Sequence, residues 1–282
     1  MALKISVEDR VSTYPGRVKL TPVQGATDLF DMVRADEPIT EGTPINKALF
    51  DNKAYTLTKD VTLYVASTGD DGSGDGSVDA PFRTIQKAID ALPKHLGGHI
   101  AEISIAFGVY NERVSVENFS NGRLIIGKSG EVFTLRGIDI VNSSFVETNI
   151  YQINKADGSS LPLFAAKKGS NVLINNNMLL DGISANVVGV SAENNSHVVV
   201  ANNTTLTVDN CTATVSATWC SFVSLSTITG SGNVVGMSAS QGSIVSYKTD
   251  TTEKMWSNLA DSGGLVLTGQ NSSDLSDATL DL

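Results

Sequence analysis

The sequence predicts an all-β protein in which short strands wind into a parallel coil, with one repeat for each turn. The first observation is a nine-residue phrase that occurs four times. Its copies occupy residues 164–172, 190–198, 215–223 and 237–245. They begin 26, 25 and 22 residues apart, and a period of this length is typical of a solenoid.

The second observation is that three positions agree in all four copies. Each copy has Ala third, Ser seventh and Val last, namely Ala166, Ala192, Ala217 and Ala239, Ser170, Ser196, Ser221 and Ser243, and Val172, Val198, Val223 and Val245. Stacked turns would place like residues in columns, with neighbouring strands about 4.8 Å apart. The small residues suit corners of the coil, where little room remains. The alternative is an ordinary β-sandwich in which the four segments are similar by chance.

The third observation is composition, which fits a thin core and limits the function. The 282 residues are 41% hydrophobic but only 6% aromatic, and the net charge is −10. This acidic balance argues against binding nucleic acid or an anionic membrane through bulk charge. No apolar run is long enough for membrane insertion, and no secretory signal peptide is visible, so we expect synthesis in the cytoplasm. Cys211 and Cys220 lack a metal-binding spacing, and we expect two buried thiols.

Residues 1–60 differ from the rest and read as a small N-terminal attachment segment. Short strands are expected at residues 18–20 and 29–33, separated by Pro and Gly. Thr43 and Pro44 suit the start of a helix over residues 45–52, since Pro at the first helical position loses no hydrogen bond. So small a segment has little core of its own, and we expect it to assemble against other chains.

The coil is expected over residues 61–269. Its cap, residues 61–93, begins with a strand at residues 61–65. Apolar residues then fall at helical spacing over residues 85–92, with Thr84 as the N-cap. Such a helix can cover the open apolar end of a coil. Strands are expected at residues 101–106, 113–116 and 123–126, within coils spanning residues 100–250, and a polar tail follows at residues 270–282.

The cap carries a resemblance to a known fold. Tyr64-Val65, the Gly/Asp loop with Asp75-Gly76, and residues 81–89 resemble the N-terminal cap of pectin-lyase-like proteins. The resemblance implies a right-handed parallel β-helix with an N-terminal capping helix. That fold serves polysaccharide lyases, polygalacturonases, pectin methylesterases and phage tailspikes, so it does not by itself identify an activity.

The N-terminal segment is similar to the leader of tail proteins in phages and prophages of Gram-positive bacteria, over residues 5–20, 33–38 and 42–50. This resemblance implies a virion tail fibre, spike or baseplate appendage that recognises host surface polysaccharide. It also implies a homo-oligomer, by analogy a trimer, with residues 1–60 contacting other tail or baseplate proteins.

Two carboxylates are the candidates for catalysis. Asp181 and Asp209 fall at similar places on successive repeats, and a glycoside hydrolase acting on bacterial surface polysaccharide needs one such pair. Since no Arg follows Arg136, the repeats lack the base that a pectate-type lyase or a methylesterase would use. Asp139, Glu147 and Asp157 precede the clear repeats and could complete a site. The alternative is that Asp181 and Asp209, followed by Gly and Asn, are turn residues.

Trp219, Asn176 and Asn203 are the candidates for glycan binding, Trp219 as a stacking platform and the amides as partners of sugar hydroxyls. The Asn residues could instead form an internal amide ladder. Asp70, Asp71 and Asp75 form an acidic cluster that could bind calcium, but it lacks the ligand order of an EF-hand and also reads as a solvated loop. No other metal site is expected.

Overall fold

The structure is a computed structural model that describes residues 11–12, 18–22, 30–34, 38–40, 56–154, 160–183, 187–256 and 259–268. Contacts divide the chain into two units, Ala2–Ala54 and Tyr55–Leu282, with Met1 grouped in the second. In the first unit, β2 and β3 form an antiparallel pair, as do β1 and β4. Their bounds are Val11–Ser12 for β1, Val18–Pro22 for β2, Phe30–Arg34 for β3 and Pro38–Thr40 for β4. The helix expected at residues 45–52 and the tail at residues 270–282 lie outside the described residues.

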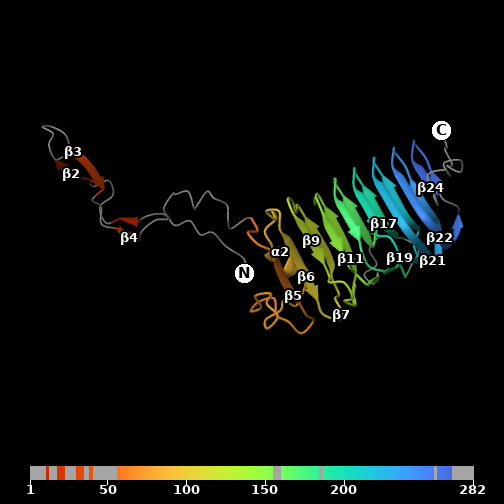
Figure 1. The fold of residues 1–282 in the computed structure, drawn as a ribbon, viewed down its shortest axis with the longest axis horizontal. Helices are drawn as coiled ribbons and strands as arrows, with labels where there is room; N and C mark the ends of the chain where they lie inside the picture. The colour runs from red at the N-terminus through yellow and green to blue at the C-terminus, as the bar shows by residue number, and fades with distance from the viewer. Residues whose placement is uncertain are drawn as a thin grey trace. The chain divides into compact units, whose positions relative to one another are not determined.

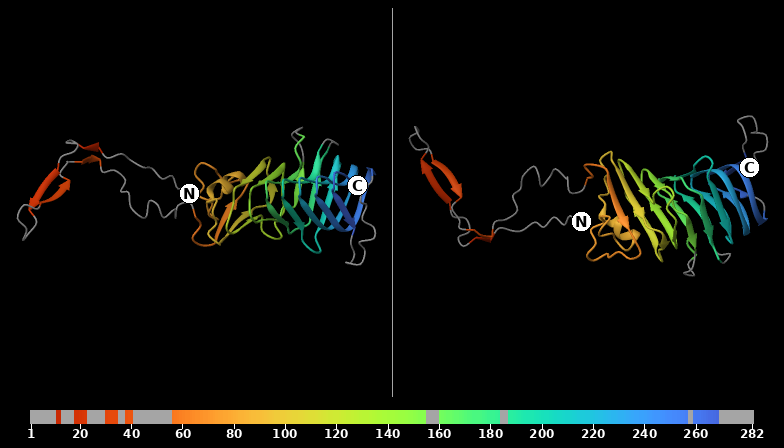
Figure 2. Two further views of the ribbon diagram at one scale, coloured as in Figure 1. Left: turned by 90° about the horizontal axis from the view of Figure 1, so that it is seen from above. Right: turned by 60° about the horizontal axis from the view of Figure 1, so that its bottom comes forward.

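The second unit is a parallel β-solenoid, which confirms the predicted fold class. Its strands pair in parallel with the strands of the preceding and following turns, and Figures 1 and 2 show the turns stacked in chain order from β5 to β24. Each complete turn contributes to three sheets. The first sheet contains β5 (Val61–Val65), β6 (Ile100–Ile105), β9 (Arg123–Ile126), β12 (Val146–Thr148), β15 (Asn171–Ile174), β18 (His197–Val200), the beginnings of β21 (Phe222–Ala239) and β22 (Ile244–Trp256), and β24 (Leu265–Thr268).

The other two sheets complete the turn. The second sheet contains β7 (Gly108–Val109), β10 (Phe133–Leu135), β13 (Gln152–Asn154), β16 (Met178–Asp181), β19 (Thr205–Asp209) and the middle parts of β21 and β22. The third sheet contains β8 (Arg113–Glu117), β11 (Gly137–Val141), β14 (Phe164–Lys167), β17 (Val188–Glu193), β20 (Ala213–Thr218), the end of β21, and β23 (Leu259–Ala260).

Like residues stack in columns inside the coil, as the repeats predict. In the third sheet, the alanines of the four copies pair in register from one turn to the next, and the column continues to Ala260. In the first sheet, the four valines do the same, and the column continues to Val266. Both sets are buried. The narrow interior between the sheets is therefore filled layer by layer.

The repeated serines form a second ladder at the corner between the third and first sheets. The backbone N–H of each buried serine donates to the hydroxyl oxygen of the serine one turn later. The donors are Ser143, Ser170, Ser196 and Ser221, and the corresponding acceptors are Ser170, Ser196, Ser221 and Ser243. Because a buried polar group without a partner is costly, this ladder lets the chain turn tightly inside the protein.

One expectation about the cysteines is wrong. Cys211 is buried, but Cys220 is exposed. Cys220 directly precedes Ser221 of the serine ladder, at the outermost point of the corner, where the backbone turns away from the core. The other three copies of the repeat have Gly169, Asn195 and Gly242 at this position, and these turn-forming residues are the sequence signal for its exposure.

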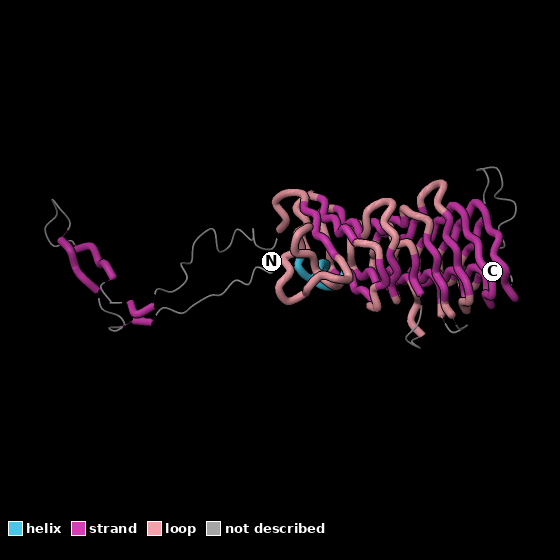
Figure 3. The backbone as a smooth tube through the Cα atoms, turned by 90° about the horizontal axis from the view of Figure 1, so that it is seen from below, coloured by secondary structure: helices cyan, strands magenta, loops and turns pink. Residues whose placement is uncertain are grey.

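The helix α2 (Ile85–Ala91) lies at the end of the solenoid where the coil begins, as Figure 3 shows. The hydroxyl of Thr84 accepts from the Lys87 N–H, which confirms the predicted N-cap, and the helix buries Ile85, Ala88 and Ile89. Among the described residues, no helix has the length and apolar character needed to span a membrane.

Candidate functional site

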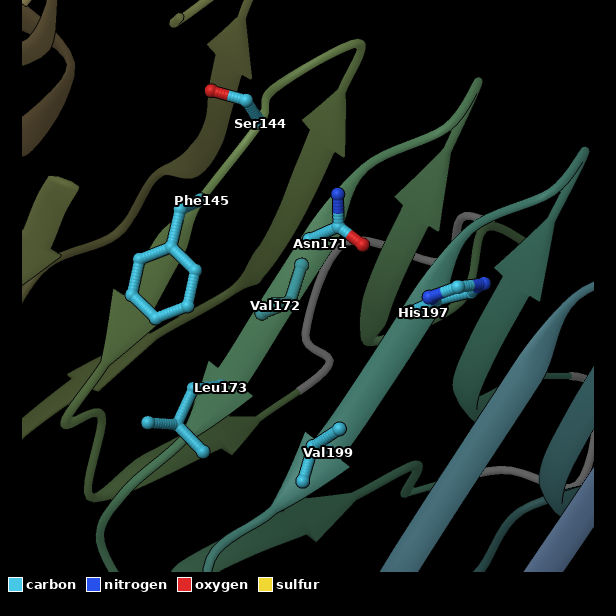
Figure 4. Close-up of a pocket in the computed structure, with 7 residues that line it drawn as sticks. All are labelled: Ser144, Phe145, Asn171, Val172, Leu173, His197 and Val199. Carbon is cyan, nitrogen blue, oxygen red and sulfur yellow. The ribbon is translucent and has the colours of Figure 1, made fainter. Parts of the chain in front are cut away.

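The candidate site is a hollow on the outer face of the first sheet, which we name the lateral groove. It crosses the segment before β12 and the strands β15 and β18, and has a volume of about 430 Å³. Figure 4 shows the residues that line it, which are Ser144, Phe145, Asn171, Val172, Leu173, His197 and Val199.

Strand alternation places most of these side chains on the surface, Val172 being the exception. Val172 and Val198 point into the core, so the residues on either side of each point outward. Parallel register then sets Asn171 beside His197, and Leu173 beside Val199. The groove therefore has a polar row and an apolar row that both run across the strands.

Two aromatic residues, Phe145 and Phe222, extend the groove. Phe145 keeps 38% of its surface exposed, although it directly precedes a strand of the sheet. At the other side, the His197 ring packs edge-on against Phe222, with centroids 6.2 Å apart and planes at 77°. The exposed Phe145 ring and the half-buried Phe222 ring lie beside an amide and an imidazole, and together they provide stacking surfaces and hydrogen-bonding groups.

An acid that is paired with an arginine lies next to the groove. Glu147 pairs in register with Leu173 and is only 8% exposed. Its carboxylate lies 3.5 Å from the Arg123 guanidinium and accepts a hydrogen bond of 3.1 Å from the Asn175 amide. None of the groove-lining residues is Asp, Glu, Lys or Arg. The lining suits an uncharged ligand that has both apolar faces and polar groups.

Asp181 and Asp209 are direct partners in the register between β16 and β19. Each carboxylate nevertheless accepts hydrogen bonds from a turn. Asp181 Oδ1 accepts from the Ile183 N–H and the Asn210 amide, both at 3.0 Å. Asp209 Oδ1 accepts from the Ser231 N–H at 2.6 Å and the Ser231 hydroxyl at 3.2 Å. The two residues are the last residues of β16 and β19 in the second sheet, whereas the lateral groove lies on the first sheet.

The three candidate glycan-binding residues do not form one site. Asn176 follows β15 and Asn203 follows β18, so both lie at the corner between the first and second sheets. Trp219 lies between β20 and β21, at the corner between the third and first sheets. Asn203 is exposed and Asn176 half-buried, so neither belongs to a buried amide ladder.

The other acidic candidates are also dispersed. Asp139 lies on the third sheet, where Arg113 Nε donates to its Oδ2 at 2.6 Å and Lys167 Nζ donates to its Oδ1 at 3.1 Å. Burial alone would raise the pKa of Asp139, but Arg113 and then Lys167 outweigh it and hold the pKa below 3.8. Glu147 is on the first sheet, and Asp157 lies outside the described residues.

The acidic loop uses its carboxylates to hold its own turns. Asp70 accepts from the Gly72 N–H and the Ser73 hydroxyl, and Asp71 accepts from Thr84 through both its N–H and its hydroxyl. Asp75 accepts from the Ser77 N–H. Within the described part of the chain, no three His, Cys, Asp or Glu side chains gather as a metal-binding group. Calcium binding at this loop stays a prediction.

No protein-family model, curated protein or solved structure matches this chain.

The sequence did not predict the lateral groove. Its polar residues Asn171 and His197 are the eighth residues of the first two repeat copies, so the repeat itself contained the signal. That position varies among copies, however, so it lacks the regularity that marks the core positions. In a stacked coil, constant positions build the core and variable outward positions distinguish one part of the surface from another.

Proposed function

We propose that this protein is a structural and receptor-binding component of a phage or prophage tail that recognises a glycan on the host cell surface. The lateral groove is the observation that carries the recognition part of the proposal. The similarity of residues 5–20 to tail-protein leaders supports the tail part, and the β-solenoid is one of the folds that such proteins use.

The groove is suited to a carbohydrate. Phe145 offers an exposed ring, while Leu173 and Val199 offer an apolar surface for the faces of sugar rings. Asn171 and His197 can exchange hydrogen bonds with hydroxyl groups. Rows of side chains cross the strands at intervals of about 4.8 Å, so an extended polymer lying along a row can contact one side chain from each turn that it crosses.

A binding assay tests the recognition. The full-length chain is incubated with purified cell-wall polysaccharide of Gram-positive bacteria, and its affinity is compared with that of Phe145→Ala. We expect the variant to bind about tenfold more weakly, a change of about 1.4 kcal/mol. Phe107→Ala is the matched control, because Phe107 is 82% exposed and is not part of the groove. Equal binding by the Phe145 and Phe107 variants would contradict the proposal.

The tail assignment and the oligomeric state need separate tests. Antibodies against this chain should label the tails of virions in electron micrographs, and unlabelled tails would count against the assignment. Sedimentation equilibrium at micromolar concentration should give a trimer, as in the tail fibres and spikes that the leader resembles. A monomer would refute that part of the proposal.

A polysaccharide-degrading enzyme is the second candidate function, favoured by the register of Asp181 and Asp209. Adjacent strands lie about 4.8 Å apart, close to the separation of about 5–5.5 Å between the carboxylates of retaining glycosidases. The hydrogen bonds that hold both carboxylates in turns favour the structural role instead. A double variant, Asp181→Asn with Asp209→Asn, decides between them. Unchanged depolymerisation of host polysaccharide would exclude these two residues as catalysts.

A further inference from the structure

The corner at Trp219 differs from the equivalent corners of neighbouring turns. Its two outermost residues adopt left-handed backbone conformations, with φ of 58° for Trp219 and 57° for Cys220. This region is unfavourable for residues with a Cβ atom other than Asn and Asp. The equivalent pairs each contain Gly or Asn and are Lys168–Gly169, Asn194–Asn195, Gln241–Gly242 and Ser262–Gly263.

Trp219 occupies the first position of its pair, where the other four corners have the polar residues Lys168, Asn194, Gln241 and Ser262, so an aromatic residue is exceptional at this position. The indole gains little burial in return, since Trp219 is 57% exposed. Turn formation and core packing both leave the choice of Trp unexplained. An unfavourable backbone conformation that carries an exposed functional group is typical of binding sites.

The neighbouring corners place amides on both sides of Trp219. The Asn195 N–H donates to the Trp219 carbonyl at 2.8 Å, and the Cys220 N–H donates to the Gln241 carbonyl at 3.0 Å. These bonds fix three consecutive corners in one row. Asn194, Asn195 and Gln241 are all exposed, so residues with amide side chains occupy the corners on both sides of Trp219.

The row also borders the lateral groove. The first residue of β21 is Phe222, whose ring contacts His197 in the groove, and Phe222 follows Trp219 by three residues. His197 itself follows the Asn194–Asn195 corner by two residues. The Trp219 corner and the polar row of the groove therefore occupy the same edge of the first sheet.

We propose that the Trp219 corner is a second carbohydrate site, in which the indole stacks on a neutral sugar ring and the amides of Asn194, Asn195 and Gln241 bind its hydroxyl or N-acetyl groups. This inference rests on the proposed function and extends the glycan surface beyond the groove. Between Gly169 and Tyr247 the only Asp, Glu, Lys or Arg residues are Asp181, Glu193 and Asp209. The three corners at residues 194–195, 219–220 and 241–242 carry no Lys or Arg, and Lys168 lies one corner further along the row, so a neutral glycan suits the Trp219 corner better than a uronate polymer.

Fluorescence measures this site directly, because the chain has only two tryptophans. In full-length Trp256→Phe, Trp219 is the remaining indole. The protein is titrated with an N-acetylglucosamine oligomer and a glucose oligomer, and with a galacturonate oligomer as the charged control. We expect a saturable change in Trp219 emission with at least one neutral oligomer and a weaker response to galacturonate. Failure of both neutral oligomers to change the emission would overturn the site.

Trp219→Asn is the decisive variant, because Asn tolerates the left-handed conformation and the corner should remain folded. Calorimetric titration with the responding oligomer should show about tenfold weaker binding. The thermal unfolding temperature should stay the same or rise, which separates a lost binding group from a damaged fold. Undiminished affinity of Trp219→Asn would overturn the proposal.

Comparison with the groove variant distinguishes the two proposals. If Phe145→Ala loses cell-wall binding and Trp219→Asn keeps full affinity for both wall glycan and oligomer, the groove stands and the Trp219 site is wrong. If only Trp219→Asn loses binding, the Trp219 site stands and the groove assignment is wrong. If the wild-type chain binds neither wall glycan nor oligomer, both fail.

Discussion

The Ser170 backbone N–H donates to the Ser196 hydroxyl oxygen at 3.2 Å, and this bond joins two successive turns of the solenoid at a buried corner. The Ser196 hydroxyl in turn donates to the Glu193 carbonyl at 2.7 Å, so one side chain satisfies two backbone groups that strand pairing leaves free. The same arrangement recurs along the corner. It explains why the repeat has Ser at this position.

Removal of this hydroxyl should destabilise the protein. In Ser196→Ala, the buried Ser170 N–H and the Glu193 carbonyl each lose a partner, so we expect a loss of about 1–3 kcal/mol in the free energy of unfolding. Chemical denaturation measures the change. Ser216→Ala is the control, since Ser216 points outward on β20 and its loss should cost less than about 0.5 kcal/mol. Equal stability of the two variants would show that the ladder contributes nothing.

The alanine column should not tolerate a larger side chain. Ala217 is fully buried between Ala192 and Ala239, and Ala217→Leu would add three carbon atoms to a filled layer. We expect a destabilisation of about 1–3 kcal/mol. Ser216→Leu adds a side chain of the same kind to the outer face of the same strand and should be tolerated. If Ala217→Leu and Ser216→Leu have the same free energy of unfolding, the interior is less closely packed than the structure shows.

Asp139 should make stability depend on acid pH. Its pKa is lowered in the folded protein, so its contribution is present above the ordinary value of 3.8 and is lost as the pH falls through the folded value. At neutral pH, we expect Asp139→Asn to lose about 2 kcal/mol, because Arg113 and Lys167 then lack their shared carboxylate. Wild type and variant should converge in acid. If the difference in unfolding free energy between wild type and Asp139→Asn does not change with pH, the ion pairs of Asp139 are not its source.

Two substitutions at Asp209 test whether its carboxylate has a structural role as a hydrogen-bond acceptor in the turn. Asp209→Ala removes the acceptor for the Ser231 N–H and hydroxyl, and should cost about 1–2 kcal/mol. Asp209→Asn keeps an oxygen acceptor and should lose less. Thermal unfolding of both variants provides the measurement. The turn interpretation would be wrong if Ala and Asn at this position were equally stable.

Much of the fold could be predicted because every turn of a solenoid must fill the same narrow interior, so the same residue types recur at the same positions. Ala, Ser and Val at constant positions indicated columns, and the register confirms them. The repeat nevertheless extends further than its clear copies. Ile140 pairs with Ala166 in the alanine column, and Val146 pairs with Val172, but Ile in place of Ala disguised this turn in the sequence.

The candidate site was harder to predict, since outward residues carry no periodic signal. From the sequence, Asn176, Asn203 and Trp219 were equally plausible as sugar-binding residues, yet they lie at two different corners of the coil. Phe145, Asn171 and His197 are separated by 26 residues at each step and meet only because consecutive turns stack.

The sequence by itself determined which residues fill the coil, because a narrow interior accepts the same few side chains on every turn. Only the tertiary structure decided which surface residues become neighbours. Turn lengths differ by a few residues, and the register between strands, rather than distance along the chain, brings side chains together on the outside.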